Sequence, residues 1–368
     1  MGCSLYRWAK QRIWKVGHNI VLGALKQFYN EKSENLSVEK VDDTVSEPNY
    51  PQEYHGIYAR ISRNFRKISE DSEKKLLDIL AEYYGKSSSE QLSEDERTMI
   101  LEHHMHTHLN DLRIEVVPWI ESLTSLNGAS VLEIGCGTGI STLAFAEQGA
   151  DVVAIDIASK DIAMAQKRCK LYGLENINFL ELGVADLVQI PGGGGFDLII
   201  YSRTFEHLTY TERIQSIKET YDMLKDGGYI VIYDAPNRLW HYDSHTSLAS
   251  FFHWLPDELA VDYAKYTTRD GFNEVFNEDK LSEGTGAFRF EGDKRNTLEK
   301  LARFGRGVSY HELEIALNRF EKLDISDFKR KFLGYSMSEF SKVLKSVGPG
   351  YVDEWFYDEI LSFAIMKK

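Results

Sequence analysis

The order of hydrophobic and polar positions divides the middle of the chain into short apolar runs separated by longer amphipathic stretches. The apolar runs are Val131–Ile134, Val152–Asp156, Asn178–Leu182, Phe196–Ser202 and Tyr229–Tyr233. Between them, apolar residues recur at helical spacing, most clearly over about 159–171 and 211–224. Short strands that alternate with helices predict βαβ units and a parallel sheet.

The first apolar run leads directly into a glycine-rich turn. Gly135, Gly137 and Gly139 follow the strand, and a helical pattern begins after them. A dinucleotide-binding turn has the spacing G-x-G-x-x-G, whereas here the third glycine comes one residue earlier. Glu133, two residues before the first glycine, would repel a pyrophosphate. The turn therefore predicts a ligand that is cationic or zwitterionic at this point.

The segment Val131–Gly139 resembles the first motif of the class I S-adenosylmethionine (SAM)-dependent methyltransferases. Acids follow the second and third runs, as they do in that family, and the resemblance extends over about Ser130–Asn237. It implies that Asp156 meets the ribose hydroxyls and that Asp186 meets the adenine amino group. The cofactor contacts that it implies are Glu133, Gly135, Cys136, Gly137, Gly139, Asp156, Ile157, Asp186, Leu187 and Ser202.

The resemblance also implies the architecture, an α/β fold with a Rossmann-like seven-stranded sheet and helices on both faces. The expected segments are a basic amphipathic helix (1–30), a linker (31–55), a helical region (56–125), the SAM-binding core (126–240), a lid inserted after the fifth strand (241–335), and a C-terminal helix and hairpin (336–368). The hairpin strands are expected near Tyr351–Phe356 and Ile360–Met366. Ser93-Glu-Asp-Glu96 predicts the capping box of a long helix. The string Arg303–Glu312 receives no assignment.

Charge and cysteine content narrow the partners and the location. The net charge of −14 argues against nucleic acid, because phosphate binding needs a basic surface. Three unpatterned cysteines indicate a reducing compartment, and we expect a cytoplasmic protein. Residues 1–30 combine basic side chains with tryptophans, which suits peripheral contact with an anionic membrane or packing against protein. The oligomeric state is left open.

Candidate catalytic residues follow the fourth and fifth runs, where strand ends border the ligand crevice of open α/β sheets. We expect His207 or His245 to be the general base and the other to orient the substrate, with Glu206 beside them. The expected substrate-binding residues are Arg203, Asn237, His241 and Asp243. In related small-RNA and ubiquinone-type O-methyltransferases, a glutamate three residues before the Glu-His pair belongs to a metal site. Here that position is Arg203, and we expect no metal, with a divalent cation as the alternative.

The function that these features favour is SAM-dependent methyl transfer to a small molecule, or to a lipid-linked or sugar-linked acceptor, at oxygen. Two alternatives remain. One is transfer to nitrogen, and the other is a catalytically silent methyltransferase fold that binds at a membrane surface. The spacing of the glycines and Glu133 argue against a NAD-dependent dehydrogenase.

Overall fold

The computed structural model describes residues 64–85, 92–269, 271–276, 297–318, 324–328, 339–347 and 358–368. Internal contacts divide the chain into two units, Met1–Glu53 and Tyr54–Lys368, and all the described residues belong to the second. The basic helix expected at 1–30, the linker at 31–55 and the strand expected at 351–356 lie outside the described residues. Among the described helices, none has the length and apolar character needed to cross a membrane.

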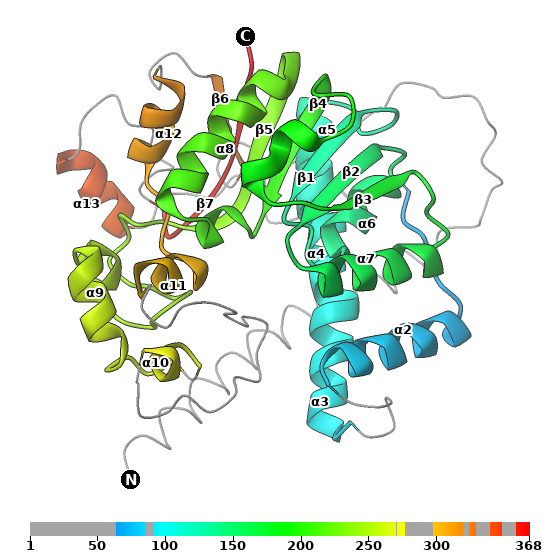
Figure 1. The fold of residues 1–368 in the computed structure, drawn as a ribbon, viewed down its shortest axis with the longest axis horizontal. Coiled ribbons are helices and arrows are strands. Elements are labelled where there is room, and N and C mark those ends of the chain that lie inside the picture. Colours follow the sequence, from blue (N-terminus) through cyan, green and yellow to red (C-terminus); the bar gives the residue numbers. More distant parts are fainter. Residues whose placement is uncertain are drawn as a thin grey trace. The chain divides into compact units, whose positions relative to one another are not determined.

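A seven-stranded sheet forms the centre of the described structure, in the order β3-β2-β1-β4-β5-β7-β6 (Figure 1). Its strands are β1 (Ser130–Ile134), β2 (Asp151–Asp156), β3 (Ile177–Glu181), β4 (Phe196–Ser202), β5 (Leu224–Pro236), β6 (Asp324–Asp327) and β7 (Ile360–Met366). The first five run parallel, and β7 pairs antiparallel with both β5 and β6. The predicted α/β architecture, with a parallel sheet and a C-terminal antiparallel strand, is confirmed.

The edge strand β6 comes from Asp324–Asp327, within the segment that the sequence analysis assigned to the lid. Its partner β7 has the predicted bounds, Ile360–Met366. Only four residues form β6, so the run is too short to produce a recognisable alternation of apolar and polar side chains. The edge strand of the sheet therefore comes from a segment that precedes the expected hairpin in the chain.

Both faces of the sheet are buried, and the side chains alternate between them as a strand requires. In β4, Leu198 and Ile200 join one apolar cluster, whereas Ile199 and Tyr201 join another. The same alternation occurs along the other central strands, which explains their almost continuous apolar sequences. One cluster packs against the N-terminal helices, and the other packs beneath α8 (Tyr210–Met223) and α12 (Tyr310–Leu317).

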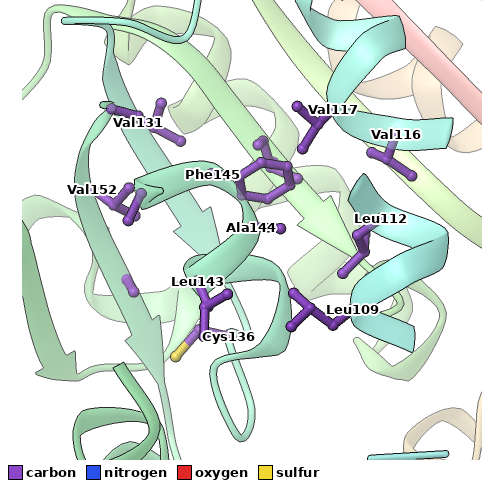
Figure 2. Packing of buried hydrophobic residues seen from close by; sticks show 14 of the residues in the cluster. Leu109, Leu112, Val116, Val117, Val131, Cys136, Leu143, Ala144, Phe145 and Val152 are labelled. Carbon is purple, nitrogen blue, oxygen red and sulfur yellow. The ribbon is translucent and has the colours of Figure 1, made fainter. Parts of the chain in front are cut away.

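The N-terminal helices form one long helical stretch that packs on the first face. It comprises α3 (Glu94–Met99), the π-helical η2 (Ile100–Thr107), α4 (His108–Asp111), the π-helical η3 (Leu112–Val116) and α5 (Val117–Leu123). The predicted capping box opens it, since the Ser93 and Glu96 side chains bond reciprocally to each other's backbone N–H. Figure 2 shows Leu109, Leu112 and Val116 facing α6 (Ile140–Ala146). Helix α2 (Glu70–Tyr83) packs beside α7 (Ser159–Leu171).

Several shorter helices complete the described structure, and most of them follow β5 in the chain. These are η4 (Val184–Gln189), η5 (Phe205–His207), η6 (Phe252–Trp254), α9 (Asp257–Ala264), α10 (Phe272–Val275), α11 (Thr297–Arg303) and α13 (Glu339–Val347). A separate apolar cluster that includes Phe252, Ala260, Phe272 and Leu301 holds η6, α9, α10 and α11 together (Figure 1). The predicted lid segment thus has a small core of its own.

Candidate functional site

The glycine turn lies at the carboxyl end of β1 and is shaped by left-handed backbone angles. Gly135, Gly137 and Gly139 all have positive φ, which explains why the sequence needs glycine there. A Cβ at Gly135 would lie 2.2 Å from Thr204 Cγ2, so the turn is pressed against the segment that follows β4. The Thr204 hydroxyl donates to the Gly135 carbonyl at 3.0 Å and joins the two segments.

Glu133, expected to meet the ligand's cationic group, is fully buried beneath the turn. Its two carboxylate oxygens accept hydrogen bonds from the hydroxyls of Ser141 and Thr142 at the start of α6. Burial raises the pKa of Glu133 to about 7, although the two hydroxyl donors oppose that shift. In this structure the carboxylate therefore supports the helix that begins after the turn.

Asp156 ends β2 beside the turn, as the sequence predicted. Its Oδ2 accepts from the Gly137 N–H at 2.8 Å, and its Oδ1 accepts from the Ala158 N–H at 2.9 Å. Burial raises the pKa of Asp156, and the two N–H donors partly offset that effect. The side chain remains partly exposed, so it can hold the turn in shape and still face a ligand.

The other expected cofactor contacts differ in exposure. Ile157 is 69% exposed and Leu187 is buried at 1%. Asp186 is exposed and accepts from the Gln189 side chain at 2.9 Å. The Cys136 thiol is buried, and burial raises its pKa, so it packs as an apolar group. Ile157 and Asp186 therefore present surface to a ligand, whereas Leu187 and Cys136 line the core.

The three expected catalytic residues come together beyond β4. One ligand-type atom from each of Glu206, His207 and His245 can be chosen so that all three atoms lie within 4.8 Å of one another. The rings of His207 and His245 have centroids 5.4 Å apart, and His207 Nε2 lies 3.7 Å from Glu206 Oε1. We call these three residues the His–Glu cluster. The sequence placed His207 and His245 on the same edge, and the structure brings them together.

Burial controls the charge of the His–Glu cluster. It raises the pKa of Glu206 to about 8, and no described residue hydrogen-bonds to Glu206 Oε2. Burial, and then the neighbouring His245, lowers the pKa of His207 to about 4. The pKa of His245 is also lowered, by burial and by Arg269. Near pH 7 both imidazoles are therefore neutral and able to accept a proton or to ligate a cation.

The previously unassigned string after α11 supports this cluster from behind. The Arg303 carbonyl lies 2.8 Å from His207 Nδ1, which assigns the ring proton to that nitrogen because a carbonyl can only accept. A Cβ at Gly305 would lie 2.6 Å from His245 Cε1, so only glycine leaves room for the ring. Sequence reasoning missed this support, and the one available signal was the pair of glycines at 305 and 307.

A buried arginine on α8 ties the string to the cluster. Arg213 donates to the carbonyl of Glu206 at 2.7 Å and to those of Arg306 and Gly307 at 2.5 and 3.2 Å. It also pairs with Glu312 at 3.1 Å. Because its guanidinium has five N–H donors in a rigid fork, one side chain can fix several backbone segments together.

The expected substrate residues fall into two groups. Arg203 directly follows β4 and lies near the surface, where it pairs at 2.6 Å with Asp234, a residue near the end of β5. Both residues have positive φ. Asp243, by contrast, is buried and accepts from the backbone N–H groups of His245, Thr246 and Ser247.

Asn237 and Asp243 therefore serve the fold in this structure. Asn237 is buried and donates to the Asp358 carbonyl at 2.6 Å. Asp243 also pairs with His253 at 3.3 Å. Burial alone would raise the pKa of Asp243, but His253 and the backbone N–H donors outweigh burial and hold this pKa below its usual range. His241 is partly buried between the rings of Trp240 and Phe251. Asp243 thus shapes the loop that carries His245.

Comparison with known proteins identifies relatives for the central part of the chain. A family model described as a methyltransferase domain matches residues 131–228. Ubiquinone biosynthesis O-methyltransferase of Paracidovorax citrulli is 31% identical over 122 residues, which cover 33% of this chain and 49% of the relative. The protein of that name from Bordetella avium is 32% identical over 126 residues, covering 33% and 48%. The chain thus spans about half the length of these curated relatives.

A solved structure of magnesium protoporphyrin IX methyltransferase from Synechocystis PCC 6803 also matches. Its TM-score is 0.32 at 22% identity, and the match covers 46% of this chain and 74% of that one.

Proposed function

We propose that this chain is a class I SAM-dependent methyltransferase and that it transfers the methyl group of SAM to a hydroxyl oxygen of a small molecule, and the similarities to the methyltransferase domain and to the named relatives support this. The observation that carries the proposal is the contact between the glycine turn and Thr204, in the segment that leads into the His–Glu cluster. Thr204 touches Gly135 on one side and lies three residues before His207 on the other. A methyl donor bound at the turn would therefore lie beside groups that can handle the proton of an acceptor hydroxyl.

The chemistry requires little more than alignment and removal of a proton. In the transfer, the acceptor oxygen forms a bond to the methyl carbon while the carbon–sulfur bond breaks, leaving a neutral thioether. The reacting atoms must approach in line at about 3 Å, with water excluded. The hydroxyl proton must also leave, and a neutral imidazole can take it. His207 and His245 meet that requirement, because burial keeps both rings uncharged near pH 7.

The choice of oxygen over nitrogen follows from this base. A neutral amine acceptor already has a lone pair and needs no base before transfer, so two neutral imidazoles and a buried carboxyl would have little to do. The relatives named above carry O-methyltransferase in their names, which supports the same choice.

A divalent cation on the His–Glu cluster is a second candidate, favoured by the short distances within it. Two neutral imidazoles and one carboxylate are donors that suit transition-metal ions. The carbonyl of Arg303 bonded to His207 Nδ1 is the kind of partner that fixes a ligating ring. When bound, such an ion would lower the pKa of an acceptor hydroxyl. The Glu206 carboxyl, with Oε2 unbonded among the described residues, would then be held as the anion.

The first experiment is calorimetric titration of the full chain with SAM and, separately, with NAD. Binding of SAM alone is expected, and binding of NAD alone would overturn the assignment. The second is uptake of labelled methyl groups, using hydroxylated aromatic compounds and matched amines as acceptors. Labelling of amines but not of hydroxyl compounds would replace the proposal with N-methyl transfer, and SAM binding with no uptake in any metabolite extract would favour the silent binding protein.

The cation candidate needs its own arm. Treatment with a chelator, followed by readdition of Zn²⁺, Mn²⁺ or Mg²⁺, is expected to remove and restore turnover if the cluster holds an ion. Titration of the chelated protein with each ion alone gives a readout that does not depend on activity, and His207→Ala should abolish it. Full turnover in the presence of chelator leaves the imidazoles acting as bases.

The small-molecule acceptor is the only partner that this proposal requires. Peripheral membrane contact through residues 1–30, and a cytoplasmic location, belong to the same proposal and rest on the sequence alone. Sedimentation of the full chain with anionic vesicles at low salt tests the contact, and loss of sedimentation on deleting residues 1–30 would support it. A full chain that stays in the supernatant argues against it.

A further inference from the structure

Arg168, on α7, is a fully buried arginine that forms no ion pair with any carboxylate in the described part of the chain. A guanidinium is costly to bury, and it is normally paired with an acid when it leaves water. Burial lowers the pKa of Arg168, which reflects this cost. The groups that compensate the charge of Arg168 therefore bear on function as well as on folding.

Backbone oxygens from two different regions surround this guanidinium. Its Nε donates to the carbonyl of Thr138 at 2.8 Å, inside the glycine turn. Its Nη1 donates to the carbonyl of His104 at 2.9 Å, in the π-helical segment η2. Arg168 thus bridges the glycine turn and the N-terminal helical stretch. The two residues whose carbonyls it binds, His104 and Thr138, are 34 positions apart in the sequence.

On the side that faces α7, the glycine turn packs closely against the helix. A Cβ at Gly139 would lie 2.7 Å from the Cβ of Ala165, one helical turn before Arg168. On its other side, the N–H of Gly137 is held by Asp156. Asp156, Ala165 and Arg168 therefore fix the backbone of the turn, and of these three residues Arg168 is the one that also bonds to the N-terminal helical stretch.

Beyond His104, the N-terminal stretch that accepts this hydrogen bond is packed against the buried core. Figure 2 shows Leu109 near Leu143 and Cys136, and all three belong to one buried cluster. The π-helical turns of η2 precede this packed part. Segments of π-helix are often found at functional sites, where the widened turn changes how backbone groups are presented.

We propose that Arg168 is a positioning residue for the cofactor, and that through it the affinity for SAM depends on the N-terminal helical segment Ile100–Leu112. This inference rests on the proposed function, since it assumes that SAM binds at the glycine turn. Coupling between two sites is reciprocal, so bound SAM must also stabilise the segment. The segment around His104 therefore acts as part of the cofactor site without touching the cofactor.

The experiment compares the full-length wild type with R168M, R168K and Y83F. Y83F is the matched control, because the Tyr83 hydroxyl bonds to Asp161 and so joins α2 to the same helix α7 without reaching the turn. The affinity for SAM is measured by calorimetry, and amide hydrogen exchange over residues 100–112 is measured with and without SAM. Thermal unfolding without SAM checks that each variant is folded.

R168M is expected to weaken SAM binding by about 5- to 150-fold, the usual range of coupling between sites. At saturating SAM its turnover should stay near that of the wild type, so the Michaelis constant for SAM rises while kcat does not fall. R168K, which can reach one carbonyl at a time, should lie between the two. Added SAM should slow exchange over residues 100–112 in the wild type and in Y83F, but not in R168M.

Several outcomes would overturn the inference. One is a folded R168M that binds SAM as tightly as the wild type. Another is a wild type in which SAM leaves exchange over residues 100–112 unchanged, and this measurement decides the matter even if R168M does not fold. A wild type that fails to bind SAM at all would overturn the proposed function instead, so the two failures are distinguishable.

Discussion

The cofactor side and the acceptor side of the site are built in different ways. On the cofactor side the contacts among the turn, β2 and α7 are close in sequence: Gly137 and Asp156 are 19 positions apart, and Thr138 and Arg168 are 30 positions apart. On the acceptor side the contacts are remote: His207 and Arg303 are 96 positions apart, and Thr246 and Gly305 are 59 positions apart. The first set lies within the continuous stretch from β1 to α7, whereas the second joins segments that are far apart in the chain.

The difference predicts separable consequences for variants. Residues between β1 and α7 hold the turn at which we propose that SAM binds, so changes there should act on cofactor affinity. Residues of the His–Glu cluster and of its supporting string should act on turnover with little effect on that affinity.

Removing the imidazole of His207 should have the largest effect. His207→Ala is expected to lower turnover by ~10²–10⁴-fold, the usual contribution of a positioned acid or base, while SAM affinity stays near wild type. Steady-state kinetics with a hydroxyl acceptor and calorimetry with SAM measure the two quantities. Lys225→Ala is the control, because the half-exposed Lys225 pairs with Asp197 at the opposite end of β4 from His207.

Normal turnover in both His207→Ala and His245→Ala would mean that neither ring is a base or a required ligand. Transfer to nitrogen, or catalysis by alignment alone, would then replace the proposal. A large loss of SAM affinity in His207→Ala would instead show that the two sides are not separable.

How much of this the sequence could predict depends on the range of the contacts. The helix expected over 159–171 is α7 with the bounds Ser159–Leu171, and the glycine turn with Asp156 beside it was correctly placed. Those features depend on hydrophobic period and turn chemistry, which are local. The place of His207 and His245 on one edge followed from strand order.

The remaining features depend on contacts that no local pattern encodes. Gly305 leaves room for a ring 60 residues away in the chain, and nothing near it in sequence reveals that neighbour. Asp243 alternates with histidines in a way that suits a substrate or metal site, yet it is buried by its own loop. Strand β6 is defined by its partner β7 rather than by its own four residues.

Gly305→Ala tests whether the supporting string positions His245. The added methyl would lie 2.6 Å from His245 Cε1, so the ring must move. A displacement of about 1 Å at a reacting group can cost ~10²-fold in rate, and we expect a loss of turnover of that order with unchanged SAM affinity. Kinetics with SAM and a hydroxyl acceptor measure it.

Gly271→Ala is the matched control for this change. Gly271 also has a positive φ, +82° against +106° at Gly305, but nothing lies within 4 Å of the added Cβ. Both variants therefore carry backbone strain, and only one carries the clash. Equal losses of turnover in the two would attribute the effect to strain and remove the positioning role of the string.

Asp156→Ala tests the cofactor side. The variant removes the acceptor for the N–H groups of Gly137 and Ala158, and it is expected to weaken SAM binding by about 1–3 kcal/mol, the range for a lost charged hydrogen bond. Calorimetry measures the affinity. Asp151→Ala, at the exposed start of the same strand, should leave it unchanged. Unaltered affinity in a folded Asp156→Ala protein would remove Asp156 from the cofactor site.

The smallest expected effect concerns stability and pH, and it tests whether the cluster is as buried as the geometry implies. The pKa of Glu206 is raised from 4.5 to about 8, so the folded protein keeps a proton there that the unfolded chain releases. Stability from this group therefore falls as pH rises from 4.5 to 8. His207 acts in the opposite sense between pH 4 and 6.5, because its pKa is lowered from 6.5 to about 4.

Between pH 7 and 8 the contribution of His207 is small, because its imidazole is neutral in the folded state and mostly neutral in the unfolded state. Glu133, whose pKa is raised to about 7, contributes equally to every variant compared here. In the presence of chelator, the free energy of unfolding of the wild type should fall across this window. Glu206→Gln, which keeps the shape of the protonated carboxyl and does not titrate, should show a smaller fall. Glu175→Gln, in an exposed loop, is the control and should follow the wild type. Urea unfolding at the two pH values measures this fall in the free energy of unfolding. An equal fall in all three proteins would mean that Glu206 is ionised in the folded state. That result would favour a cation-binding role for the His–Glu cluster.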